Sequence, residues 1–181
     1  MRVVLTGLRA LLFFTMIAGV LYTGVVTGVA QIACRHQANG SLVTRGRVVV
    51  GSELIAQKSG ARYFLSRPSA SDYGAVPSGA SHFGPTSLAL KEVVEKRKAE
   101  MGQMAPPDLL FASGSGLDPH ISPEAAQFQF TRVVEERRLT PAQSQSLRAD
   151  ISKLVEGPTF GVLGQTRINT LRLNLLLDEK Y

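Results

Sequence analysis

The chain has 181 residues, with 20 Lys and Arg against 14 Asp and Glu and a net charge of +6. The basic excess is spread along the sequence and no Lys/Arg run is interleaved with aromatic residues, so nucleic acid is not an expected partner. The single cysteine, Cys34, excludes a disulfide within the chain.

The segment Ala10 to Ala33 is an uninterrupted apolar run without a charged residue, and Arg2 and Arg9 precede it. A bilayer core is spanned by a helix of about 20 apolar residues. Residues 10–33 are therefore predicted to form a transmembrane helix that contacts the lipid bilayer. The basic flank, residues 1–9, favours a cytoplasmic N-terminus, which places residues 34–181 outside the cytoplasm.

Two alternatives involve cleavage. A signal peptide also ends in small residues, but its apolar region is usually only about 7 to 15 residues long, so a retained anchor is favoured. Ile32-Ala33-Cys34 is similar to the end of a bacterial lipoprotein site, but Gln31 stands where that site normally has an aliphatic residue. We expect Cys34 to be a small residue at the end of the helix.

One face of this helix is predicted to pack against another membrane protein. Gly24 and Gly28 are four residues apart, and Gln31 lies one turn further along the same face. Small residues at this spacing allow close helix approach, and an amide in the membrane needs a hydrogen-bonding partner.

Residues 34–181 are numerous enough for one globular domain, predicted to be α+β. Short β-branched or aromatic runs separated by glycines predict strands at Arg47–Val50 and Tyr63–Leu65. Arg67–Pro85 carries several Pro, Gly and Ser residues without apolar periodicity and is predicted to be a long loop.

Three helices are predicted to follow. The first runs from Ser87 to Met101 and is ended by Gly102 and the pair Pro106-Pro107. The second has Ser122 as its cap and Pro123 at its first position, and reaches Arg138. The third has Thr140 as its cap and continues to a stop at Gly157-Pro158. The leucine-rich stretch Ile168–Leu177 fits a buried strand or a buried helix equally well.

The chemistry of catalysis is mostly missing from the sequence. The histidines, His36, His82 and His120, are too scattered to indicate a metal site. Ser113-Gly114-Ser115-Gly116 lacks the pattern of a nucleophile elbow. A single span, an external domain and no catalytic constellation favour an accessory subunit over an enzyme.

Several segments spread over nearly the whole chain carry a resemblance to a known family. They are Gln37–Leu42, Gly51–Gln57, Arg67–Ala70, Ser115–Ala126, Leu163–Gln165 and Leu173-Asn174. Together they resemble KdpC, the C subunit of the Kdp potassium-transporting P-type ATPase, and Ser115–Ala126 is the most specific of them. Ala56, Ser66 and Thr166 depart from the glycine, glycine and proline common in that family, while the order and spacing of the segments are kept.

The resemblance implies a complex in the bacterial inner membrane. In it, a channel-like subunit, KdpA, selects potassium, KdpB hydrolyses ATP and a very small KdpF stabilises the assembly. The present chain would be a non-catalytic subunit that holds the assembly and covers the external side of KdpA. ATP and potassium would then belong to the complex, with no cofactor bound by this chain.

Two other functions stay open. KdpC-like proteins have been proposed to help the ATPase subunit bind nucleotide, which would make Gln165 the contact, although the predicted topology places Gln165 across the membrane from cytoplasmic ATP. If the resemblance misleads, the chain is a membrane-tethered exported binding domain.

Contacts to partner subunits are expected in the loops Arg67–Pro85 and Ser113–Ser122, because long loops shaped by glycine and proline often carry function. An equally weighted alternative is that Asp118 bonds nearby backbone and Arg67 forms a surface ion pair, so that both only fix local turns. The candidate interface residues are Arg67, Pro68, Ser69, Gly116, Asp118, His120 and Ser122.

Overall fold

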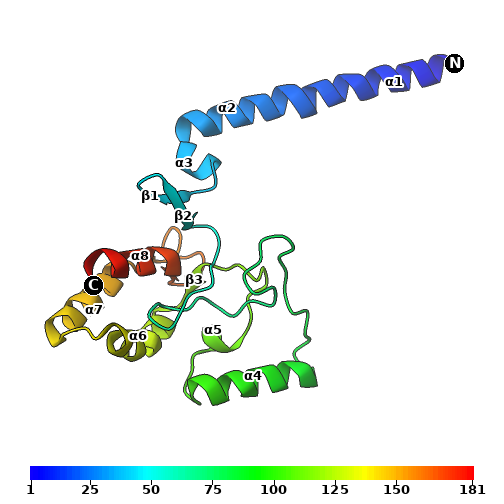
Figure 1. Cartoon of the computed structure of the whole chain (residues 1–181). Coiled ribbons are helices and arrows are strands. Elements are labelled where there is room, and N and C mark those ends of the chain that lie inside the picture. The colour runs from blue at the N-terminus through cyan, green and yellow to red at the C-terminus, as the bar shows by residue number, and fades with distance from the viewer. The chain divides into compact units, whose positions relative to one another are not determined.

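The computed structural model describes residues 1–181, which divide into two compact units, Met1–Leu42 and Val43–Tyr181. In the first unit, α1 (Arg2–Thr15), the π-helical segment η1 (Met16–Tyr22) and α2 (Thr23–Ala33) follow one another as one continuous helix (Figure 1). Its most apolar window has a mean hydropathy of 2.0, and none of that window is buried within the chain. Arg2–Ala33 is therefore long and apolar enough to cross a membrane, and the helix begins earlier than the predicted Ala10.

The short helix α3 (Arg35–Ala38) follows Cys34. Just beyond it, Asn39 exchanges two side-chain hydrogen bonds with Gln31, at 3.3 and 3.2 Å. The Gln31 amide thus has a partner in its own chain, so the case for a packing face rests on Gly24 and Gly28. A Cβ atom added at either glycine would meet nothing within 4 Å, which leaves both positions open to a neighbouring helix.

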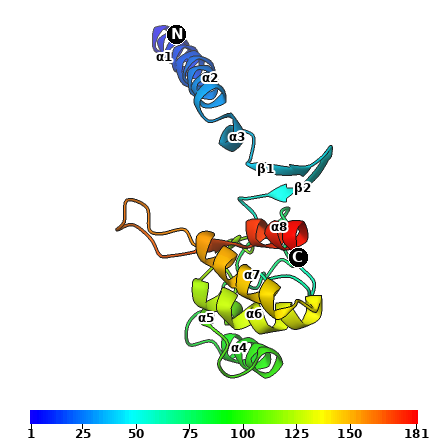
Figure 2. The same ribbon diagram turned by 90° about the vertical axis from the view of Figure 1, so that its left-hand side faces the viewer.

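The second unit contains five helices and two small sheets (Figures 1 and 2). Strands β1 (Leu42–Arg45) and β2 (Val48–Ser52) pair with each other. Strands β3 (His120–Ile121) and β4 (Ile168–Asn169) are antiparallel, with His120 opposite Asn169 and Ile121 opposite Ile168. The helices are α4 (Leu88–Met101), α5 (Pro107–Leu110), α6 (Pro123–Arg137), α7 (Pro141–Lys153) and α8 (Thr170–Lys180).

The capping residues read from the sequence set the helix starts. The Ser122 side chain accepts a hydrogen bond from Ala125 N at the start of α6, and Thr140 forms a capping box with Gln143 at the start of α7. Helix α4 ends at Gly102, whose φ of +108° suits glycine. The predicted third helix was too long, because α7 ends at Lys153 with Leu154 as its C-cap.

The prediction was incomplete at Pro107 and at Ile168–Leu177. Pro107 does not only end a helix but starts α5, where a proline without an N–H suits the first turn. Ile168–Leu177 is neither all strand nor all helix, because β4 ends at Asn169 and the Asn169 side chain caps α8.

The main core lies among α6, α7 and α8. Its largest side chains with almost no exposure come from these helices, from α5, from β3 and β4 and from the segment before Arg67. They include Phe64, Leu109, Ile121, Val133, Leu147, Ile168, Leu173 and Leu177. Helix α4 packs on α5 through a smaller cluster of Val94, Ala105 and Leu110.

The segment Tyr63–Leu65 was predicted as a strand and is not one. Asn174 of α8 accepts from Phe64 N and donates to Phe64 O, both at 2.9 Å. Gln129 of α6 accepts from Leu65 N at 2.7 Å and donates to Leu65 O at 3.1 Å. Two side-chain amides thus satisfy the backbone that a neighbouring strand would otherwise have satisfied, and the extended apolar segment enters the core between two helices.

Asp150 links α7 to the end of α8. Its carboxylate lies 2.7 Å from Lys180 Nζ and 2.9 Å from Lys153 Nζ. Hydrogen bonds from Lys180 and then Lys153 outweigh desolvation and lower the Asp150 pKa from 3.8 to about 2. A carboxyl whose folded-state pKa is depressed stabilises the fold at pH values above its unfolded pKa, and this contribution is lost as the pH falls through the folded value.

We therefore expect part of the acid sensitivity of the fold to come from Asp150. The thermal midpoint of the full chain should decrease as the pH is lowered from 4 toward 2, because the carboxylate becomes protonated in that window. Asp150→Asn should have a lower midpoint at pH 6 and a flatter profile in acid. Profiles that stay parallel for the two proteins would show that Asp150 contributes nothing to the pH dependence.

Candidate functional site

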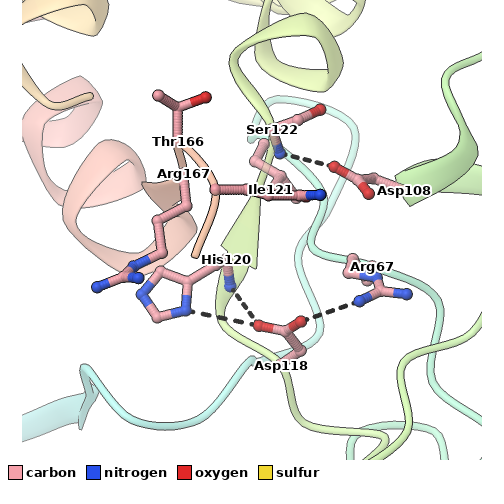
Figure 3. A pocket seen from close by; sticks show the side chains of 9 residues that line it. Arg67, Asp108, Asp118, His120, Ile121, Ser122, Thr166 and Arg167 are labelled. Atoms are coloured by element: carbon pink, nitrogen blue, oxygen red, sulfur yellow. Dashed lines mark hydrogen bonds and ion pairs between the residues drawn. The ribbon is translucent and has the colours of Figure 1, made fainter. Parts of the chain in front are cut away.

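A pocket of about 270 Å³ lies where the loop after Ser66, helix α5, strand β3 and the segment before β4 meet (Figure 3). Each of these elements contributes polar side chains to it. The lining residues are Arg67, Asp108, Asp118, His120, Ile121, Ser122, Gln165, Thr166 and Arg167.

Asp118 is at the centre of the hydrogen bonds in this pocket. Its Oδ2 accepts from Arg67 Nη1 at 3.1 Å, and its Oδ1 accepts from the backbone N of His120 at 3.0 Å and lies 3.5 Å from His120 Nδ1. Burial raises the pKa of the Asp118 carboxyl, but the hydrogen bonds from His120 and Arg67 and the Arg67 charge outweigh it, so the pKa lies below its ordinary value. The carboxylate therefore stays ionised and pairs with Arg67.

The second carboxylate of the pocket, Asp108, fixes the start of α6. Its Oδ2 accepts from Ser122 N at 2.7 Å, while the Ser122 hydroxyl accepts from Ala125 N at 3.1 Å. The N-cap residue thus uses both its backbone donor and its side-chain acceptor, which secures α6 against α5.

Other predicted interface residues shape the loops without lining the pocket. Ser69 Oγ accepts from Tyr73 N at 2.9 Å and closes a turn in its own loop. The carbonyl of Pro68 accepts from Ser113 N at 3.0 Å. Gly116 has a φ of +71°, and a Cβ at this position would lie 2.7 Å from the carbonyl oxygen of Gly79. The hydrogen bond between Ser113 and Pro68 joins the two loops. Their close approach at Gly116 leaves no room for a side chain.

The structure brings together candidates that are far apart in the sequence. Arg67, Asp118, His120, Ser122 and Gln165 all line one pocket. The predicted local bond of Asp118 and the predicted ion pair of Arg67 are both present, and the two residues are each other's partners. Gln165 is exposed at this site.

Four lining residues were not among the candidates from the sequence: the apolar Ile121 and the polar Asp108, Thr166 and Arg167. Asp108 had a signal, since an acidic residue directly after Pro106-Pro107 is typical of a first helical turn. Thr166 and Arg167 had none beyond their position next to Gln165. Arg167 forms an ion pair with Glu156 at 3.1 Å.

Within the second unit, some of the segments that carried the family resemblance contact one another or their neighbours. Ala56 N donates to Leu117 O at 2.8 Å, which joins Gly51–Gln57 to Ser115–Ala126. The side chain of Asn169 donates to the carbonyl of Glu53 at 2.8 Å. The carboxylates of Asp108 and Asp118 in this pocket are both hydrogen-bonded, so the pocket is suited to contact with a protein partner. No group of three or more His, Cys, Asp or Glu side chains in residues 1–181 is arranged to hold a metal ion.

Comparison with known families gives a match over nearly the whole chain. The model of KdpC, described as the c chain of the K⁺-transporting ATPase, matches residues 4–179. The chain belongs to the KdpC family. The loops, the pocket and the long helix except its first two residues fall within the matched range.

Curated KdpC proteins from several bacteria are similar to this chain over most of their length. A potassium-transporting ATPase KdpC subunit of Leptospira interrogans is 46% identical over 189 residues, covering 100% of this chain and 96% of that protein. The KdpC subunit of Shewanella putrefaciens is 42% identical over 96% of this chain and 89% of its own. That of Methylococcus capsulatus is 45% identical over 95% of each chain.

Proposed function

We propose that this chain is the non-catalytic accessory subunit of an ATP-driven potassium import complex. Its helix packs against the ion-conducting subunit, KdpA, and its second unit covers the external side of that subunit. KdpB and KdpF complete the complex, to which ATP and potassium belong. The observation that carries this proposal is an exposed apolar helix, Arg2–Ala33, in a chain of the KdpC family.

The character of the helix supports a membrane anchor. Its large apolar side chains are exposed in the isolated chain, among them Phe14 at 65% and Leu21 at 62%. Exposing such side chains to water along a whole helix is unfavourable, whereas lipid and neighbouring helices accept them. We place the helix in the bacterial inner membrane as a single span over residues 10–33.

The charges flanking the helix support the orientation. Arg2, Arg9 and the amino terminus lie before the apolar run, and basic residues near a span favour the cytoplasmic side. Residues 1–9 are then cytoplasmic and residues 34–181 periplasmic or extracellular.

We assign partner contact to the surface around the pocket. Arg67 and Asp118 are partly exposed, at 28% and 30% of their side chains, and the loops behind them are fixed by glycine geometry and backbone bonds. A polar, pre-organised surface that contains an arginine suits the contact region of a protein interface. Another subunit can bind this surface without rearrangement of its loops.

One observation favours a second function, assistance in nucleotide binding by the ATPase subunit. Gln165 lies in the same pocket as Arg67, His120 and Arg167, and cationic side chains suit phosphate groups. The carboxylates of Asp108 and Asp118 also line this pocket, and their negative charge disfavours the binding of a phosphate group. The proposed orientation also separates Gln165 from cytoplasmic ATP, so we rank this function second.

Orientation is tested by labelling cysteines with a membrane-impermeant thiol reagent. Cys34 and Ser78 are both exposed, so Cys34→Ser combined with Ser78→Cys gives one reporter in the second unit. We expect labelling at position 78 in intact spheroplasts. Val3→Cys in the same background should be labelled only after the membrane is opened.

If Ser78→Cys is labelled only in opened membranes, the second unit lies in the cytoplasm. Assistance in nucleotide binding would then be the better supported of the two functions. Purification of the tagged full chain from membranes tests the subunit assignment separately. Co-purification of KdpA and KdpB is expected, and a free monomer would instead support a membrane-tethered binding domain.

A further inference from the structure

The segment Glu156–Arg167 forms a hairpin that projects from the second unit (Figure 2). Two backbone hydrogen bonds close its base: Glu156 N donates to Arg167 O at 2.8 Å and Arg167 N donates to Glu156 O at 3.0 Å. Glu156 also forms ion pairs with Arg167 at 3.1 Å and with Arg172 of α8 at 3.4 Å. The base of the hairpin is therefore fixed to the folded unit.

The tip of the hairpin is apolar and unusually exposed. Thr159 and Leu163 form a second antiparallel bridge, and beyond it Phe160 is 90% exposed, Val162 79% and Leu163 61%. No charged residue occurs between Glu156 and Arg167. Single exposed apolar residues are common, but three together on a projecting tip indicate a binding surface.

The backbone holds this tip in a conformation that is unfavourable for its largest side chain. Phe160 has a φ of +55° and Gly161 a φ of +77°. Glycine accepts positive φ freely, whereas a bulky residue is strained there. The strain is not offset by burial of the ring, which protrudes away from the core.

We propose that this tip, Phe160 to Leu163, enters the interface of the bilayer that holds the N-terminal helix. The proposal rests on the proposed function in one respect, since it requires Arg2–Ala33 to be a membrane span. Only Cys34 to Leu42 separate that helix from the second unit. So short a connection keeps the second unit close to the membrane surface and gives the tip a high effective concentration of lipid.

The chemistry of the tip favours lipid over a protein pocket. Aromatic and aliphatic side chains without nearby charge enter the boundary between headgroups and acyl chains, and their binding scales with the apolar area they bury. A lipid interface needs no complementary shape and pairs with no specific polar group. Gly161 lies between Phe160 and Val162, and Gly164 follows Leu163, so the tip carries few bulky side chains besides the three apolar ones.

Quenching by brominated lipids tests this insertion in the complete complex. The full chain carries Cys34→Ser and Val162→Cys labelled with bimane, and the complex is reconstituted in vesicles of phosphatidylcholine brominated at a shallow acyl position. We expect at least about a twofold loss of fluorescence relative to unbrominated lipid, because the label contacts the acyl region. Gln145→Cys, exposed on α7, is the matched control and should keep its fluorescence.

A second variant separates insertion from damage to the fold. Phe160→Gly removes the ring, while glycine accepts the positive φ at this position. The turn is thus retained, and we expect quenching at the position 162 label to be largely lost.

Two results would overturn the proposal. If iodide quenches the label at position 162 and brominated lipid does not, the label lies in water. If neither quencher reduces its fluorescence, the label is covered by protein. Lipid quenching is independent of which leaflet is contacted. Labelling at Ser78→Cys therefore reports a wrong orientation separately from a wrong assignment of the tip.

Discussion

Replacement of Arg67 or Asp118 by alanine is expected to abolish potassium-limited growth while the second unit stays folded. The two side chains form one ion pair, at 3.1 Å and partly exposed, and such a pair contributes only about 1 kcal/mol or less to the free energy of unfolding. A residue central to an interface costs about 2 kcal/mol or more when truncated, or about thirtyfold in affinity. Assembly should therefore suffer more than folding.

Growth at low potassium, recovery of the complex and the thermal midpoint of the full chain measure these effects together. Lys58→Ala is the matched control, because Lys58 pairs with Asp72 at 2.8 Å but both side chains are at least 70% exposed away from the pocket. Asp118→Asn keeps an acceptor for His120 N and should be milder than alanine. Parallel losses of midpoint and growth in the Arg67 and Asp118 variants would show that both residues only fix local turns.

Substitution of both Gly24 and Gly28 by leucine is expected to cause a loss of assembly of similar size. A Cβ atom added at either position meets nothing within 4 Å, and leucine is a good helix former, so the helix itself should form normally. A partner helix, in contrast, would be held away from the small-residue groove. Association of membrane helices depends on this close packing, so recovery of the complex should fall several-fold.

Co-purification of KdpA with the tagged chain measures this effect. Gly24→Ala with Gly28→Ala should be nearly neutral, because alanine is small enough for close packing. Gly19→Leu is a matched bulky control, since Gly19 lies outside the spacing shared by Gly24, Gly28 and Gln31. Unchanged recovery of the double leucine variant would place this face against lipid.

The helices were the part of the fold that could be predicted, because their signals are local. Ser122 before Pro123 and Thr140 before Pro141 define two helix starts within a few residues of sequence. The prediction of a strand at Tyr63–Leu65 was wrong because the backbone of Phe64 and Leu65 bonds to the side chains of Asn174 and Gln129, which lie far along the chain. Strand propensity reports a preference for extended backbone and says nothing of which group pairs with it.

Several residues of the candidate site could be predicted from the sequence, but not that they lie together in one pocket. Arg67 and Asp118 stood out in two separate loops, and the ion pair that joins them spans 51 positions of sequence. Asp108 was missed because its role, accepting from Ser122 N, depends on how α5 packs at the start of α6. Contacts of this range follow from tertiary packing, which local patterns do not specify.

The amide contacts at Phe64 and Leu65 also determine the order in which this domain can fold. These two residues are fixed by Asn174 and Gln129, which lie 110 and 64 positions away. Pairing at such separations comes late, because the closure of long loops costs entropy before the contact forms. We therefore expect Phe64 and Leu65 to become ordered only when α6 and α8 have met. We also expect their amide hydrogens to exchange with solvent about as slowly as those of the core, although the segment has no regular secondary structure.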